Sequence, residues 1–167
     1  MPTAIDRFNS LPAGERDEML SACLRVSRWV GDVAAGIPFA DLDALVAAAD
    51  AAAAALTPAE VAEALAAHPR IGERAAGEGR EQRFSAVEQG GSDDEPEIAA
   101  ALVEGNRAYE ERFGHVFLIR AAGRSRREIV AELQRRLDND EAAEAAEVAG
   151  QLRDIALLRL RETLAVI

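Results

Sequence analysis

Apolar residues recur at helical spacing along almost the whole chain, and this pattern limits the fold more than any other feature of the sequence. Apolar positions three or four residues apart give a helix one buried face, whereas a half-buried strand needs strict alternation. The pattern predicts an all-α fold of about eight to nine helices. The expected helices cover residues 13–25, 26–34, 40–55, 58–67, 84–90, 95–113, 125–137 and 141–165, with a further short helix at 4–8.

The composition agrees with a helical fold. Alanine and leucine are abundant and aromatic residues make up only 4% of the chain, a mixture that favours helix over sheet. A chain of 167 residues is long enough for a substantial core, and we expect residues 1–167 to form a single domain.

One stretch departs from the helical pattern. The sequence FGHVFLIRAAGRS, which starts at Phe113, places a compact apolar run between two glycines. A run this short fits either a strand or a buried extended connector, and periodicity does not separate them. Because no partner strand is evident elsewhere in the sequence, we predict a connector.

Charge and composition exclude several functional classes. The net charge of −11 argues against a nucleic-acid partner, because phosphate contacts need clustered basic residues. All 19 basic residues are arginine, so a lysine Schiff base and a lysine-anchored pyridoxal cofactor are excluded. The single Cys23 allows no internal disulfide. We see neither a signal peptide nor a membrane-spanning run, and we expect a cytoplasmic protein that does not bind membranes.

His68 is the first candidate for chemistry, because it ends an alanine-rich helical run immediately before Pro69. Histidine near a helix C-terminus often serves as a cap and interacts with the helix dipole. The following proline also favours an extended backbone at His68, which would let the ring project into a cleft. Imidazole is well suited to proton transfer near neutral pH, so both interpretations stay open.

Ser85 and Glu88 have the spacing of a helix capping box, which is an ordinary structural explanation for both. A cap alone does not account for Gln89 beside the glutamate, or for the Gly90–Gly91 pair that ends the helix so soon. Together Ser85, Glu88 and Gln89 offer a hydroxyl, a carboxylate and an amide on one short turn.

Arg159 is placed on the apolar face of the last helix by its spacing from Val148, Leu152 and Ile155, whereas Arg161 points away. An arginine on a core-facing stripe needs an anionic partner, because an unpaired buried charge is costly. The partner is either an internal carboxylate or a substrate carboxylate bound by the guanidinium.

A metal site is not expected. The two histidines, His68 and His115, are far apart in sequence, and no His-x-x-x-His or cysteine-rich spacing exists. We interpret His115 as a packed or exposed residue rather than a catalytic one.

Several of these motifs, in order and at their spacing, resemble the OHCU decarboxylase family, which acts in urate breakdown. The resemblance is carried by FNSLP from Phe8, HPRIGE from His68, FSAVEQ from Phe84, NRAYEERFGHVFLIRAAGRS from Asn106 and LRDIALLRL from Leu152. These motifs cover nearly the whole chain, and their combination is far more specific than any one of them.

The resemblance implies an all-helical, two-layer fold with no metal or organic cofactor, and a homodimer. It implies conversion of 2-oxo-4-hydroxy-4-carboxy-5-ureidoimidazoline (OHCU), a small-molecule substrate, to (S)-allantoin and carbon dioxide. By position, it makes His68 and Glu88 the catalytic pair. Substrate binding would fall to Pro69, Ser85, Gln89 and Arg159 and to the backbone of Phe117, Leu118 and Ile119.

The sequence departs from the family at two places. Many members have Phe-Pro where this chain has His115–Val116, and Asp-Leu-Ala-Gly in place of residues 70–73. We interpret these differences as a bacterial form of the family.

Two alternatives to the decarboxylase remain open from the sequence. One is a hydrolase of a related ureido compound, in which His68 and Glu88 would activate water. The other is a helical binding module without catalytic activity.

Overall fold

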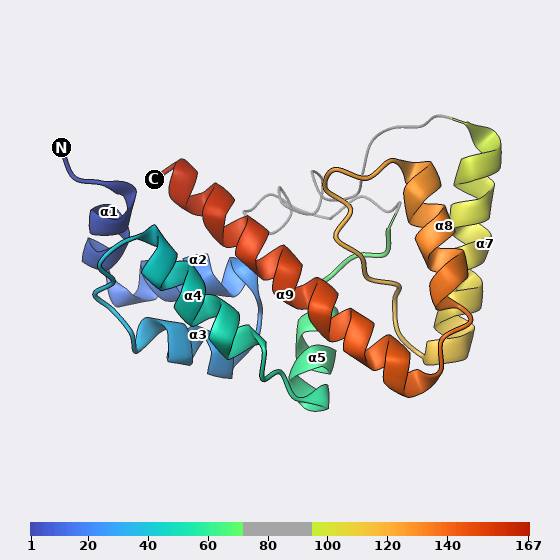
Figure 1. The fold of residues 1–167 in the computed structure, drawn as a ribbon, viewed down its shortest axis with the longest axis horizontal. Helices are drawn as coiled ribbons and strands as arrows, with labels where there is room; N and C mark the ends of the chain where they lie inside the picture. The colour runs from blue at the N-terminus through green and yellow to red at the C-terminus, as the bar shows by residue number, and fades with distance from the viewer. Residues whose placement is uncertain (72–94) are drawn as a thin grey trace. The chain divides into compact units, whose positions relative to one another are not determined.

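A computed structural model describes residues 1–71 and 95–167 of the chain (Figure 1). The described residues contain helices and irregular segments and no strand, so the predicted all-α class is confirmed. The helices are α1 (Ala4–Ser10), α2 (Ala13–Cys23), α3 (Ser27–Ala34), α4 (Leu42–Ala53), α5 (Pro58–Leu65), α7 (Pro96–Phe113), α8 (Arg126–Arg136) and α9 (Glu141–Ala165).

Each of these helices was expected from the sequence, with ends that differ by no more than two residues. Local capping explains several of the starts. At α5, the Thr57 side chain accepts from the Glu60 N–H at 3.2 Å, and the Glu60 carboxylate accepts from the Thr57 N–H at 2.9 Å. The helix predicted at 84–90 lies outside the described residues.

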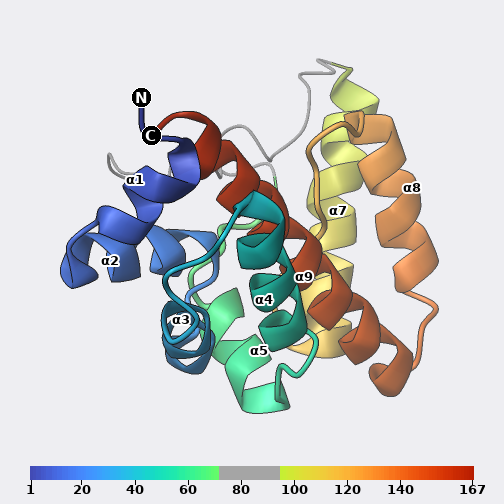
Figure 2. The same ribbon diagram turned by 60° about the vertical axis from the view of Figure 1, so that its left-hand side comes forward.

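The described chain divides into two compact units, and α9 contributes to both. The first unit contains residues 1–64 and 152–167. Within it, α3 packs against α2 and α4 (Figure 2). The Trp29 indole of α3 donates to the Ala49 carbonyl of α4 at 3.0 Å. Buried apolar side chains of the first unit include Phe8, Leu20, Trp29, Leu45, Leu152, Ile155 and Leu160.

The second unit contains residues 65–151, and its core lies against the paired helices α7 and α8. The two helices lie side by side in both ribbon views (Figures 1 and 2). A Cβ atom at Gly105 of α7 would overlap the Leu133 side chain of α8, so glycine permits this close approach. The core residues are Ile71, Leu102, Tyr109, Phe117, Ile119, Ala121, Ile129, Val130 and Leu133.

Residues 114–125, called the connector below, join α7 to α8 without forming a helix or a strand. Gly114 and Gly123 adopt positive φ angles of 78° and 79°, which favour glycine at both positions. Phe117, Leu118 and Ile119 between them are buried. The prediction of a buried connector is therefore confirmed.

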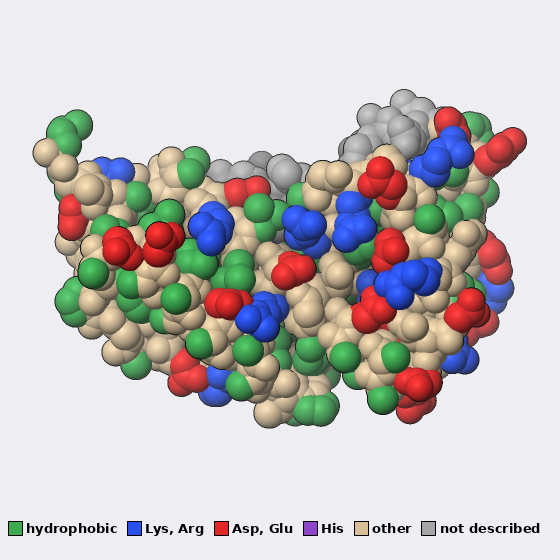
Figure 3. All heavy atoms as spheres, in the orientation of Figure 1, with side chains coloured by type: hydrophobic (Ala, Val, Ile, Leu, Met, Phe, Trp, Pro, Cys, Tyr) green, Lys and Arg blue, Asp and Glu red, His purple; other side chains and the backbone are tan. Residues whose placement is uncertain are grey.

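No single helix within residues 1–71 and 95–167 is long and apolar enough to cross a membrane. The pair α4 and α5 meets the length and composition criteria only when combined across a bend of 112°. On the face drawn in Figure 3, arginine side chains lie among aspartates and glutamates rather than in one basic patch.

Candidate active site

His68 follows the last turn of α5, as the sequence predicts. Its backbone N–H donates to the Leu65 carbonyl at 3.1 Å, which closes the end of the helix. Both His68 and Pro69 are half-buried. The imidazole therefore lies beyond the helical hydrogen-bond ladder and is partly accessible to solvent.

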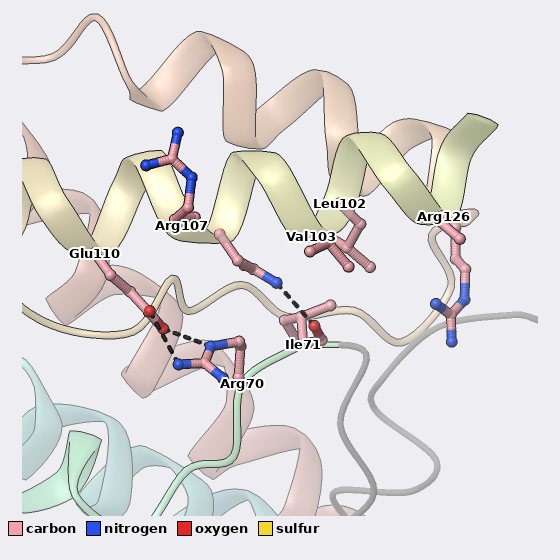
Figure 4. A pocket seen from close by; sticks show the side chains of 9 residues that line it. Arg70, Ile71, Leu102, Val103, Arg107, Glu110 and Arg126 are labelled. Carbon is pink, nitrogen blue, oxygen red and sulfur yellow. Dashed lines mark hydrogen bonds and ion pairs between the residues drawn. The ribbon is translucent and has the colours of Figure 1, made fainter. Parts of the chain in front are cut away.

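The chain after His68 is held by side chains of α7 (Figure 4). Arg70 donates to both carboxylate oxygens of Glu110, at 2.7 and 3.0 Å. One turn away, the amide of buried Asn106 donates to the Ile71 carbonyl at 2.9 Å. The Asn106 contact fixes the backbone at Ile71, and the pair with Glu110 holds the side chain of Arg70, three and two residues after His68. Neither Asn106 nor Glu110 was predicted from the sequence to belong to the site.

A cavity of about 500 Å³ lies along the same face of α7 (Figure 4). Arg70 and Glu110 contribute a charged part of its lining, and Leu102 and Val103 contribute apolar surface. Its size suits a small ligand, but His68 is not among its described lining residues. Those lining residues are Arg70, Ile71, Ala99, Leu102, Val103, Asn106, Arg107, Glu110 and Arg126.

Phe117, Leu118 and Ile119 are each less than 4% exposed. Two side chains of the second unit hold the backbone here. Arg136 donates to the Leu118 carbonyl at 2.7 Å, and the Gln151 side-chain oxygen accepts from the Arg120 N–H at 2.7 Å. The connector is thus fixed on both sides of Ile119.

Arg136 is fully buried and forms an ion pair with Glu144, which is 1% exposed. Its Nε donates to Glu144 at 2.9 Å, and the Tyr109 hydroxyl donates to the same carboxylate. The guanidinium also lies 4.6 Å from the centre of the Phe117 ring. Burial, together with the neighbouring Glu144, raises the pKa of Tyr109, so its hydroxyl remains a hydrogen-bond donor.

Arg159 is buried in the first unit, at 5% exposure, on the same face of α9 as Leu152 and Ile155. One terminal nitrogen donates to the Ala22 carbonyl at 3.0 Å. Arg161 is exposed, and Arg153 forms an ion pair with Asp50. The orientation predicted from helical spacing is therefore confirmed for both Arg159 and Arg161.

The structure describes some of the remaining candidate residues and not others. Ser85, Glu88 and Gln89 lie outside the described residues. His115 is half-buried, with its ring edge-on to Tyr109 at 5.5 Å, in agreement with a packing role. Within the described ranges, no group of three histidine, cysteine or acidic residues is arranged to hold a metal ion.

Comparison with known protein families decides which family this is. A family model described as OHCU decarboxylase matches residues 9–161. The chain belongs to the OHCU decarboxylase family. Members of the OHCU decarboxylase family are carboxy-lyases of urate catabolism, and this protein accordingly acts on a small-molecule substrate in that pathway. The matched range includes His68, Phe117–Ile119 and Arg159.

Solved structures share the fold of this OHCU decarboxylase family member. A crystal structure of OHCU decarboxylase in the presence of (S)-allantoin matches with a TM-score of 0.72 and 23% identity, over 89% of this chain and 98% of that one. A crystal structure of (S)-allantoin synthase matches with a TM-score of 0.68 and 18% identity, over 95% of this chain and 53% of that one. A comparison with curated protein sequences gives no significant match.

Proposed function

We propose that this protein converts OHCU to (S)-allantoin and carbon dioxide without a metal or organic cofactor. The observation that carries the proposal is the family match across residues 9–161, which contains most of the chain and every predicted site residue. The half-buried imidazole of His68 and the buried guanidinium of Arg159 are chemically suited to proton transfer and to binding a polar substrate.

The substrate itself provides the electron sink that many decarboxylases obtain from a cofactor. An imine lies next to the carbon that carries both the hydroxyl and the carboxylate. When the bond to the carboxylate breaks, its electron pair forms a carbon–carbon double bond and the imine nitrogen takes up a proton. The resulting enol becomes a ketone when a proton reaches the neighbouring carbon. That last protonation sets the stereocentre of allantoin.

The protein must therefore orient the substrate, move protons and expose one face of the enol. In this proposal His68 exchanges a proton with the substrate hydroxyl or ring. Glu88 orients the imidazole and sets its protonation state, and Pro69 fixes the direction from which the ring approaches.

The remaining site residues would bind the polar groups of OHCU. We assign Ser85, Gln89 and Arg159 to the ureido group and the ring oxygens, and the connector backbone at Phe117–Ile119 to the wall of the pocket. If Arg159 gripped the departing carboxylate tightly, it would stabilise the ground state and slow the reaction. We therefore place Arg159 on a ring or ureido oxygen.

We further propose that residues 1–167 work as one domain in a cytoplasmic homodimer of the bacterial form, with no nucleic-acid or membrane partner. The family match spans both compact units, which supports one functional domain. A net charge of −11 disfavours binding to nucleic acid or to anionic lipid.

The decisive experiment generates OHCU from urate in situ and follows its ultraviolet decay together with the optical rotation of the product. We expect accelerated decay, carbon dioxide release and (S)-allantoin. Racemic allantoin at the uncatalysed rate would contradict the proposal and favour a binding module. Ammonia or ring opening without carbon dioxide would instead identify a hydrolase.

A further inference from the structure

Ile119 lies between two backbone hydrogen bonds made by side chains from other parts of the second unit. On one side, the Leu118 carbonyl accepts from a terminal nitrogen of Arg136 at 2.7 Å. On the other, the Arg120 N–H donates to the side-chain oxygen of Gln151 at 2.7 Å. We call these two bonds the Ile119 clamp.

The clamp fixes the two peptide groups that flank Ile119. A trans peptide is planar, and its C=O and N–H point in opposite directions. Both peptides are trans, because within the described chain the one cis bond is Ile37–Pro38. With the Leu118 carbonyl directed at Arg136, the Ile119 N–H is directed away from that guanidinium. With the Arg120 N–H directed at Gln151, the Ile119 carbonyl is directed away from that amide.

Within residues 1–71 and 95–167, the backbone polar groups of Ile119 have no hydrogen-bond partner. Ile119 is 2% exposed, yet neither its N–H nor its C=O forms a hydrogen bond with any residue that the structure describes. Buried backbone groups are almost always paired, because an unpaired one loses its hydration without compensation. One donor and one acceptor in fixed directions are therefore available to a ligand.

The Arg136 side of the clamp is rigidly supported. The guanidinium is fully buried, and two of its nitrogens donate to Glu144, which is itself 1% exposed. The third nitrogen donates to the Leu118 carbonyl. Asn139 donates to the second oxygen of Glu144 at 3.1 Å. Lysine could not replace this arrangement, because it presents a single nitrogen instead of a planar fork.

We propose that Arg136 and Gln151 are positioning residues that set the N–H and C=O of Ile119 to bind a urea-type edge of the substrate, in which an N–H lies next to a C=O. This proposal rests on the proposed function, because OHCU carries such edges in its ring and in its ureido group. Ile119 makes the contact, and Arg136 and Gln151 act through it. Rotation of either flanking peptide would break the match between donor and acceptor.

The first test changes Gln151, which is half-buried, so its replacement leaves the core intact. Gln151→Leu removes the acceptor for the Arg120 N–H, whereas Gln151→Glu keeps an oxygen in place. We expect Gln151→Leu to raise KM about tenfold, the effect of losing one well-placed hydrogen bond, and to lower the enantiomeric excess of allantoin. Gln151→Glu should keep the wild-type KM and the wild-type enantiomeric excess. A Gln151→Leu enzyme with wild-type KM and enantiomeric excess would overturn the proposal.

The second test compares Arg136→Lys with Arg135→Lys. Arg135 is the neighbouring residue of α8 and is half-exposed, with ion pairs to Glu132 and Glu147. We expect Arg136→Lys to raise KM and lower the enantiomeric excess, and Arg135→Lys to leave both unchanged. If the two variants behave alike, the assignment of Arg136 is wrong. Should Arg136→Lys fail to fold, the Gln151 pair decides alone.

A third measurement separates this proposal from the proposed function. In the full-length protein labelled with ¹⁵N, (S)-allantoin should shift the Ile119 amide resonance, and Gln151→Leu should weaken that response. A wild-type enzyme that does not decarboxylate OHCU contradicts the proposed function and the substrate role of Ile119 with it. If the wild type is active but its Ile119 resonance does not shift with (S)-allantoin, only the positioning role of Arg136 and Gln151 is contradicted.

Discussion

Arg70 donates two hydrogen bonds to the carboxylate of Glu110, from Nε at 2.7 Å and from a terminal nitrogen at 3.0 Å. The two residues are 40 positions apart in sequence, and Arg70 is only two residues after His68. The pair therefore ties the segment that carries the imidazole to the last turn of α7. Such two-pronged pairing restricts direction as well as distance.

We predict that Glu110→Gln lowers kcat/KM for OHCU about threefold to tenfold, because a small displacement of a catalytic group is costly. The stability of the fold should change by less than about 1 kcal/mol, since both side chains are partly exposed. Steady-state kinetics and thermal unfolding measure the two effects. Glu111→Gln is the matched control, because Glu111 pairs with Arg107 and both side chains are more than half exposed. Equal activities of the two variants would refute a role for the Arg70–Glu110 pair.

Arg159→Ala should reduce kcat/KM about ten- to a hundredfold, the loss of a charge-assisted hydrogen bond to substrate. Arg161→Ala should have little effect, because Arg161 is exposed whereas Arg159 is buried. Kinetics of the two variants under identical conditions measure the difference. If Arg161→Ala abolishes activity and Arg159→Ala does not, the assignment from the helical face is wrong.

Arg159 was found from the sequence and Arg136 was not, although the same rule applies to both. Arg159 follows Leu152 and Ile155 at helical spacing, and Arg136 follows Ile129 and Leu133 in the same way. Both arginines are buried. An arginine on the apolar face of a helix thus indicates a specific buried contact with a polar partner. Searching every helix for such an arginine would have identified Arg136 as well.

Other parts of the site could not be predicted because they depend on contacts distant in sequence. Helices follow from local periodicity and capping, which explains the close agreement of their ends. The pairing of Arg70 with Glu110, and of Gln151 with the Arg120 N–H, depends on how α7, α9 and the connector pack. No local sequence pattern specifies which polar residues, distant in sequence, will form a hydrogen bond with one another.

Glu144→Ala should destabilise the fold by about 3–5 kcal/mol, because it leaves the fully buried Arg136 without its carboxylate. Glu104→Ala should change the free energy of unfolding far less, because both side chains of the Glu104–Arg107 pair are exposed. Urea denaturation followed by circular dichroism gives both free energies of unfolding. Similar values for the two variants would show that the Arg136–Glu144 pair adds little beyond a surface ion pair.

Stability should fall in acid partly through Glu60. A hydrogen bond from Arg28, aided by the Thr57 N–H, lowers the pKa of Glu60 from its usual 4.5 to about 2. A lowered pKa means that folding favours the ionised form, so the contribution is complete above pH 4.5 and is lost as the pH falls toward 2. Thermal midpoints measured across this range should fall less steeply for Glu60→Gln and Arg28→Met than for the wild type. Identical slopes in all three proteins would rule out this contribution.

His68→Asn should lower kcat by about a hundredfold or more, because the proposed mechanism routes a proton through the imidazole. The chain offers a matched control, since its other histidine, His115, packs edge-on against Tyr109. His115→Asn should retain most of the activity. Both variants should unfold near the wild-type temperature, because both rings are only half-buried.

The assay is OHCU decay with chiral analysis of allantoin, in which His68→Asn should approach racemic product at the uncatalysed rate. Full activity and stereoselectivity in His68→Asn would remove His68 from the mechanism, whereas loss of activity in His115→Asn alone would move the proton transfer to the connector.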